Sequence, residues 1–231
     1  ICLDTEGNIY ISAYNQETNQ SDIYIYKSLS QDPAWPDSLS VSPALISKIT
    51  LPDNGVSKGL TVGPNGNDIY VSNFDNGRIY HFQGTPDTGY NLDSSFAVTI
   101  KEPLVNDTLT IETGPWGLYY LKEKNLLFCA AASEMILEMG EKKDFSYEYG
   151  KIFILHPITA SILDTIDIAQ WNYQHLNQSY KDRISGTIPG NASGYTSNYK
   201  IDFDNENHLY THSYYGWAVE KWEYDGELPT I

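Results

Sequence analysis

The feature that most constrains this chain is a pattern that recurs four times along its 231 residues. Each copy is a polar turn, mostly rich in Asn, Asp and Gly, followed at once by an apolar and aromatic strand; the copies are 3–12, 62–72, 120–130 and 203–212. Their anchor residues, separated by 60, 58 and 82 positions, are Ile9, Ile69, Leu127 and Leu209. Self-similarity at spacings of this size indicates a fold built from repeated supersecondary units.

Further strand-like segments surround each anchor. One follows the anchor in every unit, at 21–27, 77–83, 150–156 and 218–224, and another follows in the first three, at 44–51, 96–101 and 161–168. A strand also precedes the anchor at 58–62, 116–121 and 199–203, with a candidate remnant at 1–4. The stretch 130–143 is predicted as either a short helix or an extended hairpin. Four short strands of alternating polarity in each unit are the pattern of β-propeller blades.

We therefore predict an all-β protein, a single β-propeller domain over 1–231, with blades at about 1–51, 58–101, 116–168 and 199–231. The segments GLTVGPNGNDIYVSNFDNGRIYHFQ (59–83) and GKIFILHPITASILDTIDI (150–168) resemble blades of the propellers that include NHL-repeat, YVTN-repeat and gluconolactonase-like proteins. The resemblance concerns the blade pattern and covers almost the whole chain. It implies a ring of six to eight blades, so we expect the four visible blades to be part of a larger propeller. Blade pattern fixes fold far better than function.

Composition excludes several classes of partner. The chain carries 14 Lys and Arg against 30 Asp and Glu, a formal net charge of −16. Nucleic acid and anionic membrane surfaces attract basic proteins, so neither is an expected partner. No window approaches the roughly 18 apolar residues of a membrane-spanning helix, so membrane insertion is not expected. The two cysteines, Cys2 and Cys129, lack metal-ligand spacing and are predicted to be buried as small apolar side chains.

The connections between strands fall on two faces of a propeller, because successive strands of a blade alternate in direction. We call top the face that carries the second-to-third loops and the crossovers to the next blade. Its two longest connections, 132–149 and 169–198, have 18 and 30 residues, a length typical of binding loops. The second carries Trp171 and Tyr173 among amides and hydroxyls, which suits recognition of a protein or glycan surface. The alternative is that these rings pack as a lid on the neighbouring blade.

A second candidate site is the mouth of the central channel, where the innermost strands begin. Gluconolactonase-like propellers carry metal-binding Asn or Asp side chains just before the Gly-apolar pair that opens the innermost strand. The resemblance therefore implies ligand positions at the same place in this chain. The aligned residues here are Lys58, Trp116 and Tyr199, none of which suits a hard divalent cation. We therefore expect no metal and no cofactor at these positions. The three side chains either line the channel mouth as ligand contacts or fill the junctions between blades.

One acidic pattern has a simpler interpretation than a metal site. Asp202, Asp204 and Glu206 have the alternate spacing of calcium loops, but the Gly at the sixth position and the distal Glu are missing. Asp4 and Glu6 stand at the same place in the first unit. This correspondence favours acidic residues that belong to a strand-to-strand turn.

Three functions remain open. We expect first a non-catalytic propeller that binds a protein or glycan through its top-face loops and works outside the cytoplasm, at the cell surface, in the periplasm or in the extracellular space. The acidic, Tyr- and Asn-rich, Cys-poor composition motivates this location. The alternatives are a metal-dependent hydrolase of the lactonase or esterase type and a structural repeat in a surface assembly. Binding is favoured over catalysis, because the sequence contains no nucleophile elbow, P-loop or dinucleotide fingerprint.

Overall fold

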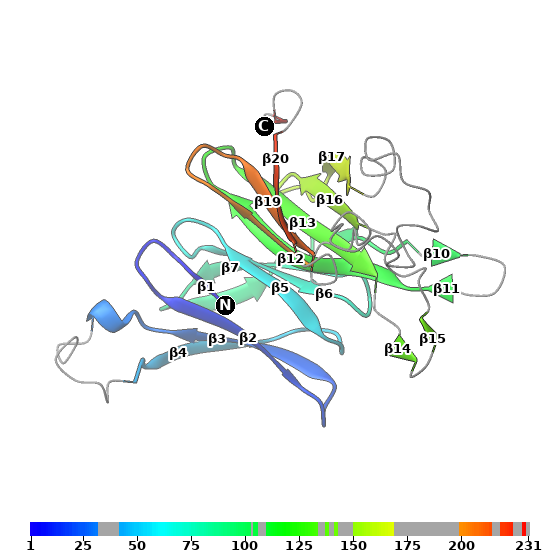
Figure 1. Cartoon of the computed structure of the whole chain (residues 1–231). Coiled ribbons are helices and arrows are strands. Elements are labelled where there is room, and N and C mark those ends of the chain that lie inside the picture. Colours follow the sequence, from blue (N-terminus) through cyan, green and yellow to red (C-terminus); the bar gives the residue numbers. More distant parts are fainter. Residues whose placement is uncertain are drawn as a thin grey trace.

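The computed structural model is an all-β protein in which four antiparallel sheets are arranged as a β-propeller (Figure 1). It describes residues 1–31, 42–102, 104–105, 110–133, 137–138, 141–142, 150–168, 199–213, 218–223 and 228–229. Within these ranges helix is almost absent, and the one complete helical element is the 3-10 turn η1 (Leu29–Gln31). The described residues include no helix with the length and apolar character needed to cross a membrane.

The first two sheets each place their strands in chain order. The first sheet contains β1 (Cys2–Leu3), β2 (Ile9–Asn15), β3 (Gln20–Tyr26) and β4 (Leu45–Thr50). The second sheet contains β5 (Ser57–Val62), β6 (Asp68–Asn73), β7 (Arg78–Thr85), β8 (Gly89–Leu92) and β9 (Val98–Thr99). Both β8 and β9 pair with β7, so they share its outer edge.

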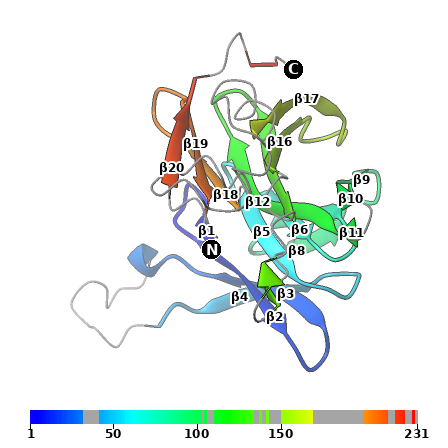
Figure 2. The same cartoon turned by 45° about the vertical axis from the view of Figure 1, so that its right-hand side comes forward.

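The third and fourth sheets follow the same plan. The third sheet contains β12 (Thr113–Leu121), β13 (Leu126–Ser133), β16 (Gly150–Leu155) and β17 (Ile162–Asp167). The fourth contains β18 (Lys200–Phe203), β19 (Leu209–Ser213) and β20 (Ala218–Trp222). Two small hairpins, β10 (Leu104–Val105) with β11 (Thr110–Ile111) and β14 (Leu137–Glu138) with β15 (Glu141–Lys142), lie outside these sheets. Figure 2 shows the innermost strands β1, β5, β12 and β18 grouped toward the centre.

The same turn conformation joins the first two strands of every sheet. Each of these turns has one residue with positive φ, a conformation that Gly and Asn adopt at low cost; these residues are Gly7, Gly66, Asn125 and Asn207. This shared requirement explains why the repeated segments of the sequence are rich in Gly and Asn at one place. The turn composition is therefore a conformational signal.

Three apolar cores lie between successive sheets, because the strands are buried on alternate faces. Ile69 and Val71 of β6 pack with the first sheet, whereas Tyr70 packs with the third. On β13, Cys129 packs toward the second sheet and Phe128 toward the fourth. The second and third sheets are thus apolar on both faces. Burial of these apolar side chains is the main contribution that stabilises the packing of the four sheets.

The predicted strands are confirmed, with one correction in the second sheet. The sequence predicts its outer strand at 96–101, but β8 pairs with the second half of β7, and β9 takes only the part near Arg78 and Ile79. The tight turn after Thr85 returns the chain to the edge of β7 at once, so Gly89 is the first residue to reach it. In the stretch 130–143, the hairpin alternative is correct where the structure describes it, because β14 pairs with β15.

Candidate functional site

Backbone hydrogen bonds define the two faces of the propeller. On the top face, the crossover between the first two sheets is bonded to both neighbouring hairpin turns: the Gly55 N–H donates to the Asn19 carbonyl (2.9 Å) and the Phe74 N–H to the Val56 carbonyl (3.0 Å). On the opposite face, which we call the bottom, the Thr5 N–H donates to Pro64 of the next sheet (3.1 Å). The innermost strands β5, β12 and β18 therefore begin at the top face.

The structure brings together three predicted site residues at these strand starts. The Lys58 ammonium nitrogen lies 4.4 Å from the centre of the Trp116 ring and 5.9 Å from that of Phe74. The rings of Trp116 and Tyr199 meet edge to face, with centroids 4.4 Å apart. Phe74 contacts Trp116 in the same manner at 5.6 Å. We call Lys58, Phe74, Trp116 and Tyr199 the top-face row; it joins the second, third and fourth sheets.

Lys58 and Trp116 each lie in a β-bulge, where the regular pairing of their strand is interrupted. In β5 the register shifts between Ser57 and Leu60, so Lys58 and Gly59 oppose a single residue of β6. In β12 the register shifts in the same way between Pro115 and Leu118, which places Trp116 in the second bulge. A bulge changes the direction of a side chain relative to the regular pleat. Equivalent bulges in neighbouring sheets thus place Lys58 and Trp116 side by side.

The blades approach each other closely beneath the row. A Cβ atom built on Gly59 would lie 2.0 Å from the carbonyl oxygen of Trp116, and one on Gly117 would lie 2.8 Å from that of Tyr199. The Ser72 hydroxyl joins the first pair, because it accepts a hydrogen bond from the Gly59 N–H (2.7 Å) and donates to the Trp116 carbonyl (2.8 Å). The Gly that follows Lys58 and the Gly that follows Trp116 are therefore required by the contact with the next strand.

The row fills the junctions between blades and also presents polar groups at the top face. Lys58 is exposed, whereas Trp116 and Tyr199 are half-buried. Other described lysines, such as Lys48 and Lys151, form ion pairs with carboxylates, but no described carboxylate pairs with Lys58. These side chains pack together where neighbouring blades meet, and their role as ligand contacts at the channel mouth stays a prediction.

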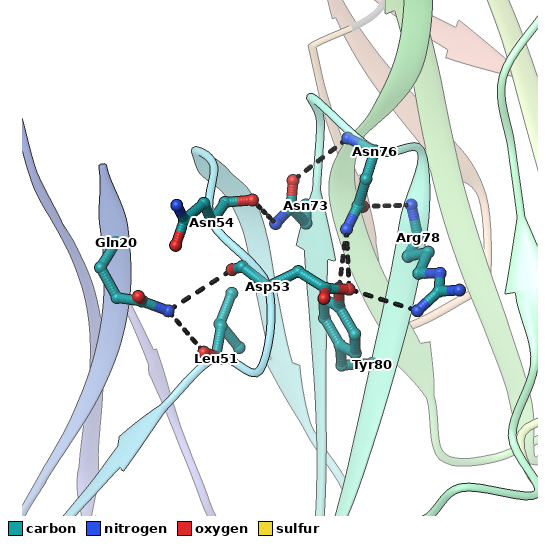
Figure 3. Close-up of polar contacts among 8 residues, drawn as sticks. All are labelled: Gln20, Leu51, Asp53, Asn54, Asn73, Asn76, Arg78 and Tyr80. Carbon is teal, nitrogen blue, oxygen red and sulfur yellow. Dashed lines mark hydrogen bonds and ion pairs between the residues drawn. The ribbon is translucent and has the colours of Figure 1, made fainter. Parts of the chain in front are cut away.

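The top-face crossover is held by a polar cluster (Figure 3). The Asp53 carboxylate accepts hydrogen bonds from the Tyr80 hydroxyl (2.5 Å), the Asn76 amide (3.2 Å) and the Arg78 guanidinium (3.2 Å). The Gln20 amide donates to the Leu51 carbonyl (2.5 Å) and so joins the first sheet to the same segment. Burial raises the pKa of Tyr80, and its hydrogen bond to the Asp53 carboxylate adds to the effect. This cluster fixes the crossover that leads into Lys58.

The four innermost strands also border a central cavity of about 500 Å³. Its lining includes bottom-face turn residues such as Thr5 and Pro64 and charges of both signs, among them Asp4 and Lys200. The members of the top-face row are absent from this lining among the described residues. The row and the cavity are therefore separate features of the channel.

The acidic turns are confirmed as turn caps. The Asp204 carboxylate accepts hydrogen bonds from the backbone N–H groups of Glu206 and His208 (2.9 Å each). Desolvation raises the pKa of Asp204, but the hydrogen bonds from His208 and Glu206 outweigh it and hold this pKa below its usual range. Asp4 caps the equivalent turn of the first sheet in the same way. Within the described ranges, no group of three or more His, Cys, Asp or Glu side chains is placed to hold a metal ion.

One ionisable residue that the sequence analysis missed is the fully buried His81. Its Nε2 lies 2.8 Å from an Asp68 carboxylate oxygen, and its Nδ1 lies 3.1 Å from one of Asp93. The ring stacks on Tyr70 at 4.6 Å with an interplanar angle of 3°. The hydrogen bond from the Ser95 hydroxyl makes the largest contribution to the lowered pKa of Asp93, and the hydrogen bond with His81 makes a smaller one. Because this imidazole is closed to solvent, we assign it to the packing of the second sheet.

The remaining predicted site residues, Trp171 and Tyr173, lie outside the described residues, so their recognition role stays a prediction. The cysteines behave largely as expected. Cys129 is fully buried in the core between the second and third sheets, and Cys2 is partly buried against the core between the first and second sheets. Burial raises the pKa of both thiols, that of Cys2 to about 12, which keeps them protonated and unreactive.

Comparison with known proteins gives distant structural likenesses and no match by sequence. No family model and no curated protein matches the chain. Among solved structures, the chain is similar to a protein from Lactobacillus plantarum, with 11% sequence identity and a TM-score of 0.44. The match covers 97% of this chain and 57% of the Lactobacillus chain. The chain therefore spans a little more than half the length of that structure.

Proposed function

We propose that this chain is a non-catalytic binding module that recognises a protein or glycan through its top face and works outside the cytoplasm. The observation that carries this proposal is the top-face row, in which Trp116 contacts Lys58 of the preceding blade and Tyr199 of the following one. Aromatic side chains with a polar end are enriched where proteins bind partners, because they combine apolar area with hydrogen-bonding groups. The repeated blade pattern supports membership of the NHL, YVTN and gluconolactonase-like propellers.

The surroundings of the row support recognition by a prearranged surface. The bulges at Lys58 and Trp116 and the close contacts at Gly59 and Gly117 fix the backbone from which these side chains project. A prearranged surface loses less conformational entropy on binding than a mobile one. In the sequence, the long connection 169–198 that carries Trp171 immediately precedes Tyr199.

Arrays of immobilised glycans and peptides, probed with the labelled protein, test the binding function. We expect binding that Lys58→Gln weakens and that Lys124→Gln leaves unchanged, since Lys124 lies in the turn between β12 and β13 at the bottom face. The proposal is wrong if the protein binds neither array, or if both variants weaken binding equally. Fractionation of the source cells tests the location, with the protein expected outside the cytoplasmic fraction.

A further inference from the structure

We infer that the top-face row is a receptor for a carboxylate that stands beside an apolar group, as in an acidic peptide segment of a partner protein. This inference rests on the proposed binding function and names the chemistry that the site takes. Its starting point is the Lys58 ammonium, which lies over the Trp116 ring and forms no ion pair with a described carboxylate. An ammonium without a partner among the described carboxylates is available for an external anion.

The aromatic contact orders this ammonium before a ligand arrives. At 4.4 Å from the ring centre, it is within the range of a cation–π interaction, and Phe74 bounds it on a second side at 5.9 Å. The indole face attracts the ammonium electrostatically, but it offers no lone pair that could accept a conventional hydrogen bond. The remaining N–H groups therefore need oxygen acceptors, and a carboxylate supplies two with charge-assisted bonds.

A second, independent observation concerns unsatisfied donors at the same strand starts. Two buried side-chain polar atoms of the described structure lack a hydrogen-bond partner, and they are Ser57 Oγ and Trp116 Nε1. Buried polar groups are normally paired, so water, or an acceptor admitted by a small movement of the surrounding side chains, would satisfy these two atoms. Ser57 precedes Lys58 in β5, and Trp116 is the ring beneath the ammonium. An indole N–H is a donor only, so it too requires an acceptor.

The aromatic rings around Lys58 and the net charge of the chain both favour a ligand with an apolar group next to its carboxylate. Phe74 and Trp116 flank the ammonium, and Tyr199 packs against Trp116, so aromatic surface is present to stabilise an apolar side chain next to the carboxylate. The net charge of −16 repels anions that make no further contact. A uronic acid offers hydroxyls on most of its ring carbons, whereas a peptide carboxylate next to a leucine or phenylalanine side chain matches both parts of the site. These contacts favour a peptide over an acidic glycan.

Titration of the intact chain with N-acetyl-leucine and with its neutral amide tests the inference. The readout is the NMR signal of the Trp116 indole N–H, assigned by its loss in Trp116→Phe. We expect the carboxylate to shift this signal in a saturable manner and to bind about tenfold or more tightly than the amide. Lys58→Gln should remove this preference, Lys58→Arg should retain it, and Lys124→Gln should leave it unchanged.

Four results would overturn the inference: equal binding of the acid and the amide, no binding of either, equal loss in Lys58→Gln and Lys124→Gln, or tighter binding of glucuronate than of N-acetyl-leucine. If the arrays show partner binding that depends on Lys58 while the acid and amide bind equally, the binding function stands and the carboxylate inference fails. If the arrays show no partner at all, the proposed function itself fails.

Discussion

Gly59→Ala probes the contact that joins the second and third blades beneath the top-face row. A Cβ atom at this position would lie 2.0 Å from the carbonyl oxygen of Trp116, far inside the ordinary contact range of 3.4–4 Å. A backbone oxygen cannot rotate away as the end of a side chain can, so β5 and β12 must separate. The separation also stretches the two hydrogen bonds of the Ser72 hydroxyl, which measure 2.7 and 2.8 Å.

The expected loss is large for a single methyl group. Overpacking costs about 1–3 kcal/mol, and weakening two hydrogen bonds adds about 1 kcal/mol, which predicts a fall of about 2–4 kcal/mol in the free energy of unfolding. For a chain of this size the corresponding fall in Tm is about 4–16 °C. Urea unfolding followed by circular dichroism measures the change in free energy, and a thermal scan measures Tm.

Gly63→Ala is the matched control, since it adds the same methyl group to the turn after β5. Its nearest contact would be the Asp68 side chain at 3.3 Å, and its φ is not in the positive range. We expect this variant to remain within about 1 kcal/mol of the parent. Equal unfolding midpoints for the parent, Gly59→Ala and Gly63→Ala would refute the close approach of the blades.

Three further predictions concern ionisable groups. His81→Phe should lower the free energy of unfolding by about 1–3 kcal/mol in urea, because Asp93 loses a hydrogen-bond partner, and unchanged stability would contradict that role. The carboxyls of Asp93 and Asp204 have lowered pKa values, so their stabilisation is present above about pH 4 and lost as the pH falls; Asp204→Asn should flatten the acid limb of the unfolding curve. Burial raises the pKa of Tyr70 and, to about 12, that of Tyr90, so the unfolded state releases these protons first. Stability should therefore fall above about pH 10, and ionisation of Tyr70 or Tyr90 near pH 10 in the folded protein would contradict this account.

The sequence was sufficient to predict the strands and turns because both leave local signals. Alternating polarity marks the strands, and each first turn needs a residue such as Gly66 or Asn125 that tolerates positive φ. The outer edge of the second sheet was predicted less well, since 96–101 and β8 both have strand-forming residues and only the tight turn after Thr85 decides between them.

The site was predictable in part. Aligning the units placed Lys58, Trp116 and Tyr199 at equivalent positions, and equivalent positions of neighbouring blades lie close together in a propeller. Their contacts depend on the two bulges and on the glycine approach, which are properties of paired strands and not of one segment. His81 was missed because its partner Asp93 lies in the connection after β8, whose position no local pattern revealed.

The account depends most on the ordered Lys58 ammonium over the Trp116 ring, and its side-chain NMR signals test this geometry directly. We expect the Lys58 methylene protons next to the ammonium to show upfield ring-current shifts and nuclear Overhauser contacts to the Trp116 indole. Trp116→Leu should return those protons to the shifts of an ordinary exposed lysine. Random-coil shifts for Lys58 in the parent protein, without contacts to the indole, would contradict the top-face row and the binding function built on it.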